Sequence, residues 1–216
     1  MTIGSGNKTT ETRPVSGFDR IELYGVGRLV VRQTGAQSLT VEGDDNIVPL
    51  VRTEVSEQTL MIGLERNAQI QPRVPLVFNV TTSDLSALTL SGAGSIEADD
   101  LRADNFETTI SGAGNTHLGN ITAGRLTATL SGAGDFKVSG NVADQEVVLT
   151  GAGSYRARDL QSHNANVRTA GAGSATVRVS DNLAASLSGV GSIRYYGSPT
   201  VQQHRSGIGS ITKVDD

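Results

Sequence analysis

The stretch LSGAGS, residues 90–95, decides the fold because it returns almost unchanged along the chain. The first glycine of each Gly-x-Gly falls at 92, 112, 132, 151, 171, 189 and 207, so successive copies are 18 to 20 residues apart. An earlier copy, Gly25-Val26-Gly27, stands 67 residues before Gly92. A fixed period of this length indicates a repeat architecture in which every copy belongs to one structural unit.

Around each copy, apolar and polar residues alternate, and this pattern predicts β-strands rather than helices. Leu126, Leu130, Phe136 and Val138 share the parity of the two glycines between them, whereas the other parity is mostly polar. Turn-forming pairs such as Gly119-Asn120 separate the copies. A unit of strand, corner, strand and turn is typical of one coil of a parallel β-helix. The leucine-rich repeat has a similar length, but its consensus is missing.

The glycines have the inward parity, so in a β-helix they form two ladders that run up the stacked coils. Glycine there permits a sharp corner, with a positive φ as one option, and lets opposing walls approach closely. We therefore predict that these residues are structural corner glycines: Gly25, Gly27, Gly92, Gly94, Gly112, Gly114, Gly132, Gly134, Gly151, Gly153, Gly171, Gly173, Gly189, Gly191, Gly207 and Gly209.

The residue between the two glycines then faces outward, and its copies form a narrow apolar strip. A continuous apolar stripe is uncommon on a monomer, so a homo-oligomer packed along the strip is one expectation. The alternative is that alanine is simply the residue that fits a tight corner. The strip consists of Ala93, Ala113, Ala133, Ala152, Ala172, Val190 and Ile208.

The chain is predicted to be one β-helix domain, residues 1–216, with less regular N-terminal coils over 1–87 and regular coils over 88–216. The 67-residue gap before Gly92 leaves room for about three more coils. Strands are predicted within it at 39–42, 50–55, 60–64 and 74–81; a separate small sandwich is the alternative. Arg205 and Lys213 take positions that are apolar in other coils, which indicates a C-terminal cap.

Composition limits the class of protein. Hydrophobic residues make up 37% of the chain, enough for a core, and the absence of cysteine excludes disulfides and cysteine metal sites. A net charge of −4 gives no reason to expect a nucleic-acid partner. No apolar run is long enough to span a bilayer. The polar start MTIGSGNKTTETRP lacks a signal peptide, which fits either a cytoplasmic protein or an exported one whose signal is absent.

No constellation of residues points to catalysis, a cofactor or a metal. None of the Gly-x-Gly copies completes the phosphate-binding pattern G-x-G-x-x-G. Asp99, Asp100 and Asp104 are the densest acids, and they are interpreted as a solvated turn. His117, His163 and His204 lack ligand spacing. Only Tyr24 and Tyr196 are aromatic residues of outward parity that could serve a glycan, which disfavours a deep glycan cleft.

The beginning of the chain carries a more specific signal. After GSGN at 4–7, Val15, Phe18, Ile21, Leu23 and Gly25 match the opening V-x-x-F-x-x-I-x-L-x-G, and VEGDDN at 41–46 matches V-x-G-D-x-N. With the repeated S-G-A-G segments, the chain resembles the bacterial family of the putative auto-transporter adhesin, head GIN domain. The resemblance covers nearly the whole chain.

The resemblance implies a right-handed parallel β-helix, pectin-lyase-like in architecture, and an exported protein of the periplasm, outer membrane or cell surface. It implies no enzyme, since the family brings no catalytic residues. We therefore expect an adhesin or cell-envelope scaffold that acts through its surface, with itself or a cell-surface glycan or protein as partner. The alternative is a polysaccharide-active β-helix enzyme of the pectin-lyase type.

Changing Ala133 and Ala152 together to glutamate tests association along the strip. A corner tolerates an outward carboxylate, whereas a packed interface does not, because burying an unpaired charge is costly. If the strip is an interface, light scattering at high micromolar concentration shows an oligomer for the parent and a monomer for the variant. A monomeric parent, or a variant that keeps the mass of an oligomeric parent, contradicts the interface.

Overall fold

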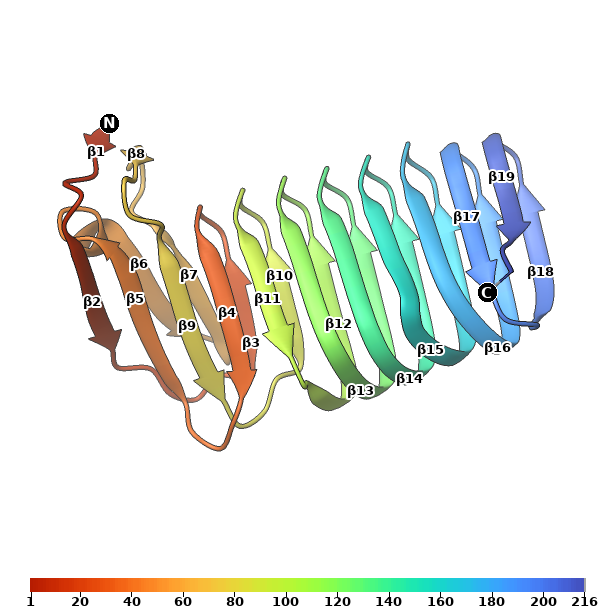
Figure 1. Ribbon diagram of the computed structural model, residues 1–216, viewed down its shortest axis with the longest axis horizontal. Helices are drawn as coiled ribbons and strands as arrows, with labels where there is room; N and C mark the ends of the chain where they lie inside the picture. The colour runs from red at the N-terminus through yellow and green to blue at the C-terminus, as the bar shows by residue number, and fades with distance from the viewer. Residues whose placement is uncertain (216) are drawn as a thin grey trace.

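The computed structural model describes residues 1–215 and shows a β-solenoid of stacked parallel strands (Figure 1). The N-terminal elements are β1 (Thr2–Ile3), β2 (Lys8–Arg13), β3 (Arg20–Leu23), β4 (Arg28–Gln33), β5 (Ser38–Asp44), the 3₁₀ turn η1 (Val48–Leu50), β6 (Val51–Ser56), β7 (Thr59–Leu64), β8 (Ile70–Gln71) and β9 (Val77–Thr82). The following strands are β10 (Ala87–Leu90), β11 (Ser95–Asp99), β12 (Arg102–Ile110), β13 (Asn115–Leu130), β14 (Asp135–Leu149), β15 (Ser154–Thr169), β16 (Ser174–Leu187), β17 (Val190–Tyr196), β18 (Thr200–Arg205) and β19 (Ile208–Lys213).

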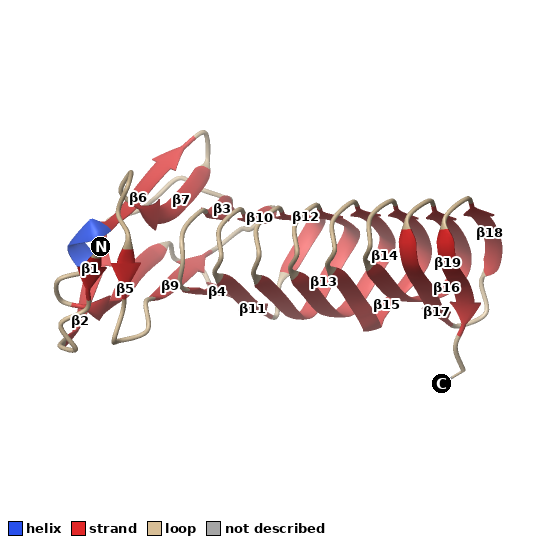
Figure 2. Ribbon diagram, turned by 90° about the horizontal axis from the view of Figure 1, so that it is seen from above, coloured by secondary structure: helices blue, strands red, loops and turns tan. Residues whose placement is uncertain are grey.

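Each regular coil consists of two walls joined by a Gly-x-Gly corner at one edge and a bend at the other (Figures 1 and 2). We call the wall after each corner sheet A and the wall before each corner sheet B. In β13 to β16 the chain passes through the bend as one long strand, and neighbouring coils pair in parallel, for example Thr116 with Phe136 in sheet A and Leu126 with Gln145 in sheet B. The predicted solenoid of coils is therefore confirmed.

The core lies between the two sheets and is made by the residues of inward parity. Leu126, Phe136 and Val138 are buried, and most of their register partners in the neighbouring coils are buried aliphatic or aromatic residues. Phe136 and Tyr155, one coil apart, pack edge to face with ring centroids 5.5 Å apart. Because every coil buries its apolar side against the opposite wall and its backbone against the next coil, the coils stabilise one another.

The corners continue the hydrogen-bonded ladder from coil to coil. In the six corners from Ala93 to Val190, the middle residue donates its N–H to the carbonyl of the first glycine of the preceding coil, for example Ala113 to Gly92 at 3.2 Å and Ala133 to Gly112 at 3.1 Å. A Cβ on Gly132 would overlap the carbonyl oxygen of Gly112 and lie 2.7 Å from that of Ser111. Glycine is therefore required because the preceding coil occupies the space of a side chain.

The structure specifies two details of the corner. Among the sixteen corner glycines, all within the described residues, only Gly27 has a positive φ, at 126°. From Gly92 onward, the nearest obstacle to a side chain on a corner glycine is the carbonyl oxygen of the matching glycine in the preceding coil. A corner that stacks on an identical corner keeps ordinary backbone angles, and the 4.8 Å rise between coils sets the steric limit.

The segment between the first two Gly-x-Gly copies follows a different path from the three coils that we expected. β3 pairs in parallel with β10, and β4 pairs with β11, so the coil around Gly25 stacks directly on the coil around Gly92. Residues 34–86 leave the solenoid and return. β9, β5 and β2 extend sheet A, and β7 and β6 extend sheet B, with antiparallel pairs beyond β9 and β7. They form a cap over this end of the core.

The two motifs at the start of the chain hold this cap together. Asn46 accepts a hydrogen bond from the N–H of Ser5 at 2.9 Å and donates to the carbonyl of Ile3. The buried Asp44 carboxylate accepts backbone N–H groups at 2.7 to 3.0 Å. Burial raises the pKa of Asp44, but three N–H donors lower it to a net value below the ordinary one. These donors belong to Gly6, Val74 and Arg73.

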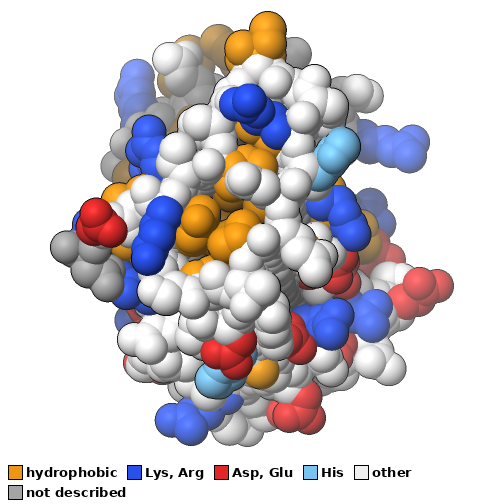
Figure 3. Space-filling view, turned by 90° about the vertical axis from the view of Figure 1, so that its right-hand side faces the viewer, with side chains coloured by type: hydrophobic (Ala, Val, Ile, Leu, Met, Phe, Trp, Pro, Cys, Tyr) orange, Lys and Arg blue, Asp and Glu red, His pale blue; other side chains and the backbone are white. Residues whose placement is uncertain are grey.

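The C-terminal end of the solenoid is closed less completely. Arg205 stands in register with the buried Leu187 and turns its guanidinium to the carbonyl of Gly209, at 2.8 Å. Lys213, in register with Tyr195, reaches the Ser198 hydroxyl at 3.3 Å. Figure 3 looks onto this end and shows hydrophobic side chains at its centre with Lys and Arg side chains around them. Charged side chains at inward positions are a known means of ending a β-stack in water.

Replacing Gly132 by valine should lower the free energy of unfolding by roughly 2–4 kcal/mol, because the new side chain overlaps the coil below. The matched control is Ala133→Ser, which changes an exposed position in the same corner and should cost less than about 0.5 kcal/mol. Urea unfolding measures both. Equal stability of the two variants would contradict the stacked-corner arrangement.

Candidate functional site

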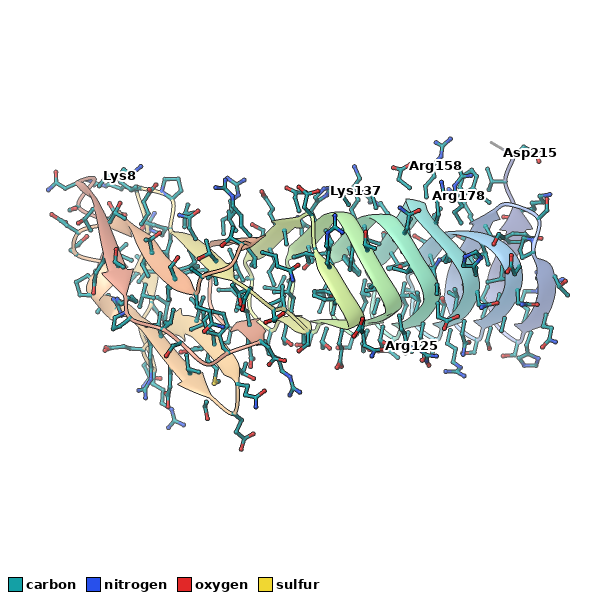
Figure 4. The ribbon with its side chains drawn as sticks, turned by 90° about the horizontal axis from the view of Figure 1, so that it is seen from below. Lys8, Arg125, Lys137, Arg158, Arg178 and Asp215 are labelled. Atoms are coloured by element: carbon teal, nitrogen blue, oxygen red, sulfur yellow. The ribbon has the colours of Figure 1, made fainter. Side chains whose placement is uncertain are left out.

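The main candidate site is a groove of about 430 Å³ with a mixed polar and apolar lining, at the bend edge opposite the corners. It opens between the bends of β14, β15 and β16 and the turn after β17. Figure 4 views this edge of the solenoid and shows Arg158 and Arg178 standing close together on it. The groove is lined by Asn141, Val142, Gln161, Ser162, His163, Arg178, Val179, Ser180, Gly197 and Ser198.

The groove exists because the coils become shorter at this point. The corner spacing falls from 20 residues, between Gly151 and Gly171, to 18, between Gly171 and Gly189. In register, Ala157 pairs with Val177 but Gln161 pairs with Arg178, so residues 158–160 of β15 have no counterpart in β16. The wider bend of β15 therefore projects beyond the narrower bend of β16. We call the place where these two bends meet the coil step.

The floor of the groove is a hydrogen-bonded chain that runs into the core. The buried Tyr155 hydroxyl donates to Gln145 Oε1 at 3.1 Å, and Gln145 Nε2 donates to Ser162 Oγ at 2.7 Å. Ser162 Oγ donates in turn to the carbonyl of Arg178 at 2.8 Å. Burial raises the pKa of Tyr155, so its hydroxyl remains a donor. The chain is satisfied at each member and therefore fixes the position of Ser162.

Two guanidinium groups stack on Tyr196 beside the groove, and Arg178 also lines it. The Arg158 and Arg178 Cζ atoms lie 5.0 and 5.2 Å from the ring centroid of Tyr196, within the range of cation–π attraction. Tyr196, which we expected to be available to a glycan, is only 9% exposed because the arginines cover it. Arg178 is further fixed by donating from Nε to the carbonyl of Arg158 at 2.9 Å.

The rim of the groove carries a serine, a histidine and an aspartate in an arrangement unlike a catalytic triad. His163 Nδ1 lies 3.3 Å from Ser180 Oγ and 3.5 Å from Asp181 Oδ2, so both partners meet the same ring nitrogen. Ser180 also donates to Asp181 Oδ1 at 2.5 Å. A triad needs the serine and the acid on opposite nitrogens of the imidazole. Ser180 is therefore oriented by Asp181 and is not activated by His163.

The acids of the predicted turn lie at the bend of β11 and contact the next coil. The Asp99 side chain occupies the space above Gly119, where a Cβ would collide with it. Asp100 Oδ1 accepts from Asn120 Nδ2 at 2.5 Å. Both acids line a depression of about 500 Å³ that also contains Arg32, Arg28 and Glu97, and the last two are ion-paired. Asp104 is exposed and does not line it.

The histidines and the middle corner residues are distributed as follows. His117 lines a shallow depression with Lys137 and Arg156, and His204 is exposed on β18. Within residues 1–215 no three His, Cys, Asp or Glu side chains are grouped to hold a metal ion.

The seven strip residues are exposed along the corner edge, and Val190 and Ile208, with exposed fractions of 58% and 78%, are adjacent in register. No helix in the described chain has the length and apolarity for a membrane span.

Our reading of the sequence missed the groove, although two signals for it were present. The corner spacing changes at Gly171, which marks the coil step. Gln145 stands at an inward position between Leu126 and Ala165, where a polar side chain requires a buried partner. Neither signal identifies Ser162 or His163, because their positions depend on how the bends stack.

Comparison with known proteins agrees with the fold. The family model described as putative auto-transporter adhesin, head GIN domain, matches residues 17–199, which confirms the resemblance. A putative adhesin from Bacteroides fragilis is 26% identical with a TM-score of 0.95, covering 99% of this chain and 100% of its own. A putative lipid binding protein from Parabacteroides distasonis is 27% identical with a TM-score of 0.80, covering 98% of each chain. The search among curated proteins found no match.

The hydrogen bond between Tyr155 and Gln145 below the groove predicts that the effects of substitutions at these two residues on stability are coupled. Tyr155→Phe leaves Gln145 Oε1 without its donor, and Gln145→Leu leaves the Tyr155 hydroxyl buried without an acceptor, so each should cost about 1–3 kcal/mol. In the double variant neither group is left unpaired, and its loss should be smaller than the sum by at least about 0.5 kcal/mol. Urea unfolding of the four proteins measures the coupling. Strictly additive losses would contradict the buried chain.

Proposed function

Because the chain belongs to the family of the putative auto-transporter adhesin, head GIN domain, we propose that it is a non-catalytic adhesion module of the bacterial cell envelope. In this proposal the solenoid is a rigid support, exposed to the periplasm or the cell surface, and the groove at the coil step holds a hydroxyl-rich glycan. The observation that carries the proposal is the chemistry of the groove, which offers hydrogen-bond donors and acceptors side by side on a fixed frame.

The lining groups match the hydroxyl groups of a sugar, each of which both donates and accepts. Asn141 and Gln161 present amides, Ser180 and Ser198 present hydroxyls, and His163 has one ring nitrogen remaining beyond its contacts with Ser180 and Asp181. Sites of this kind derive specificity from a few fixed polar groups. The buried chain below Ser162 and the stacked arginines fix the floor and rim before a ligand arrives, which reduces the entropy lost on binding.

Two observations favour binding over catalysis. The Ser180, His163 and Asp181 side chains lack the relay geometry of a hydrolase. In the depression near Asp99, Glu97 is ion-paired with Arg28, and Asp99 and Asp100 contact the adjoining coil. A glycoside hydrolase would require two carboxyl groups facing one substrate bond. The acids here serve the structure of the bends.

The relative named as a lipid binding protein suggests another ligand class. In this chain, the hydroxyl of Ser162 and the polar chain beneath it lie at the groove floor, beside the apolar side chains of Val142 and Val179. An acyl chain would leave these polar groups without partners. A glycan therefore fits the groove better than a lipid. Self-association along the exposed corner strip is a separate proposal about partners and would leave the bend edge free.

Binding to a glycan array followed by calorimetry with the retained glycan tests the proposal. We expect binding to at least one surface glycan, weakened about tenfold or more by His163→Ala, which removes one polar contact of the groove. His204→Ala is the matched control, since it removes an exposed imidazole from β18, and it should bind like the parent.

Two results would count against this function. One is the absence of any retained glycan, or equal affinity of both histidine variants. The other is the release of reducing ends or unsaturated products from an acidic polysaccharide by the parent, lost in Asp99→Ala, which would support the enzyme instead.

A further inference from the structure

Another depression lies at the opposite end of the molecule from the groove, against the cap. It has a volume of about 750 Å³, and its floor includes Tyr24, at the end of the first coil, and Met61 and Leu64 of β7. Figure 2 shows the β6–β7 hairpin standing out from the line of the solenoid at this place. The charged residues that line the depression are Arg52, Glu54, Glu65 and Arg66.

Tyr24 interrupts the repeat. It directly precedes the first glycine of its corner, in the motif YGVG, where the other copies read SGAG, TGAG, AGAG, SGVG or SGIG. The other coils therefore form the same corner with a small residue, and the corner itself does not require an aromatic ring. The residues at this position in the other coils are Ser91, Ser111, Ser131, Thr150, Ala170, Ser188 and Ser206.

The ring of Tyr24 is held flat against the neighbouring strand. A Cβ on Gly63 would overlap ring atoms Cδ2, Cε2 and Cζ, so the ring lies directly over that glycine. The backbone is fixed as well, since the N–H of Tyr24 donates to the carbonyl of Ile62 at 2.9 Å. Tyr24 remains partly exposed, and it lines the depression. One ring face is thus supported by backbone, which leaves the other available for stacking.

The residues around the Tyr24 ring supply positively and negatively charged groups. Arg52 and Glu54 form an ion pair with 3.1 Å between Nη2 and Oε2, and both side chains are mostly exposed. Glu65 and Arg66 are exposed at the other side. Two arginines and two glutamates give no net charge, so the depression favours a neutral ligand over an acidic or a basic one.

We propose that Tyr24 is the stacking platform of a carbohydrate-binding site for a neutral hexopyranose unit. The C–H groups on one face of the sugar lie on the exposed ring face, which is rich in π-electron density. Arg52 and Arg66 donate hydrogen bonds to the sugar hydroxyls, and Glu54 and Glu65 accept hydrogen bonds from them. The site is distinct from the groove at the coil step and binds whether or not that groove does.

NMR titration of the whole chain with methyl glucoside, methyl galactoside and methyl mannoside tests the site. We expect at least one of them to shift the Tyr24 ring resonances with millimolar affinity and to receive saturation transfer at its C–H groups. Tyr24→Phe keeps the ring and should bind within about threefold of the parent. Tyr24→Ser, the residue of the other corners, should abolish binding. His163→Ala should bind like the parent, which separates this site from the groove.

A second variant keeps the test decisive if Tyr24→Ser fails to fold. Arg52→Ala with Arg66→Ala removes two exposed cations and leaves the ring in place, and the sugar affinity should then fall about fivefold or more. The proposal is overturned if none of the three glycosides shifts the Tyr24 ring at 100 mM, a concentration of the order that detects weak ligands. It is also overturned if a folded Tyr24→Ser, or the double arginine variant, binds like the parent.

Discussion

The whole structure depends on the hydrogen bond between the middle residue of one corner and the first glycine of the corner before it. Ala113, Ala133 and Ala152 all donate to such a carbonyl, at 3.1 to 3.2 Å. This bond forms only if the glycine carries no Cβ, since a side chain would occupy the place of the carbonyl below. It links each such corner to the corner of the preceding coil, so the hydrogen-bonded ladder between coils continues from sheet B through the corner into sheet A.

The solenoid could be predicted from the sequence because its main determinants are local and repeated. The spacing of Gly92, Gly112 and Gly132 sets the coil, and strict alternation sets which side chains are buried. The path of residues 34–86 could not be predicted in the same way. The strands there have the same alternation, and only the long-range pairing of β3 with β10 decides that they form a cap rather than more coils.

The candidate sites are harder to predict, because they lie where the repeat is broken. The coil step follows from a change of two residues in the corner spacing, yet the groove depends on which bend overhangs the other. Tyr196 has outward parity but is covered by Arg158 and Arg178, a contact between coils that no local pattern shows. Tyr24, by contrast, could be recognised as a large residue at a position of small ones. Both candidate sites thus lie at the irregular places of a regular scaffold.

Amide hydrogen exchange at the corners tests the central claim most directly. The side chains of Ala113, Ala133 and Ala152 are exposed, so in an ordinary surface turn their N–H groups would exchange rapidly. Because each N–H is bonded to the preceding coil, we predict protection comparable to that of the adjoining strand residues Leu118 and Leu126. Exchange of the three alanines near the rate of an unstructured peptide, with the strands still protected, would contradict the continuous ladder.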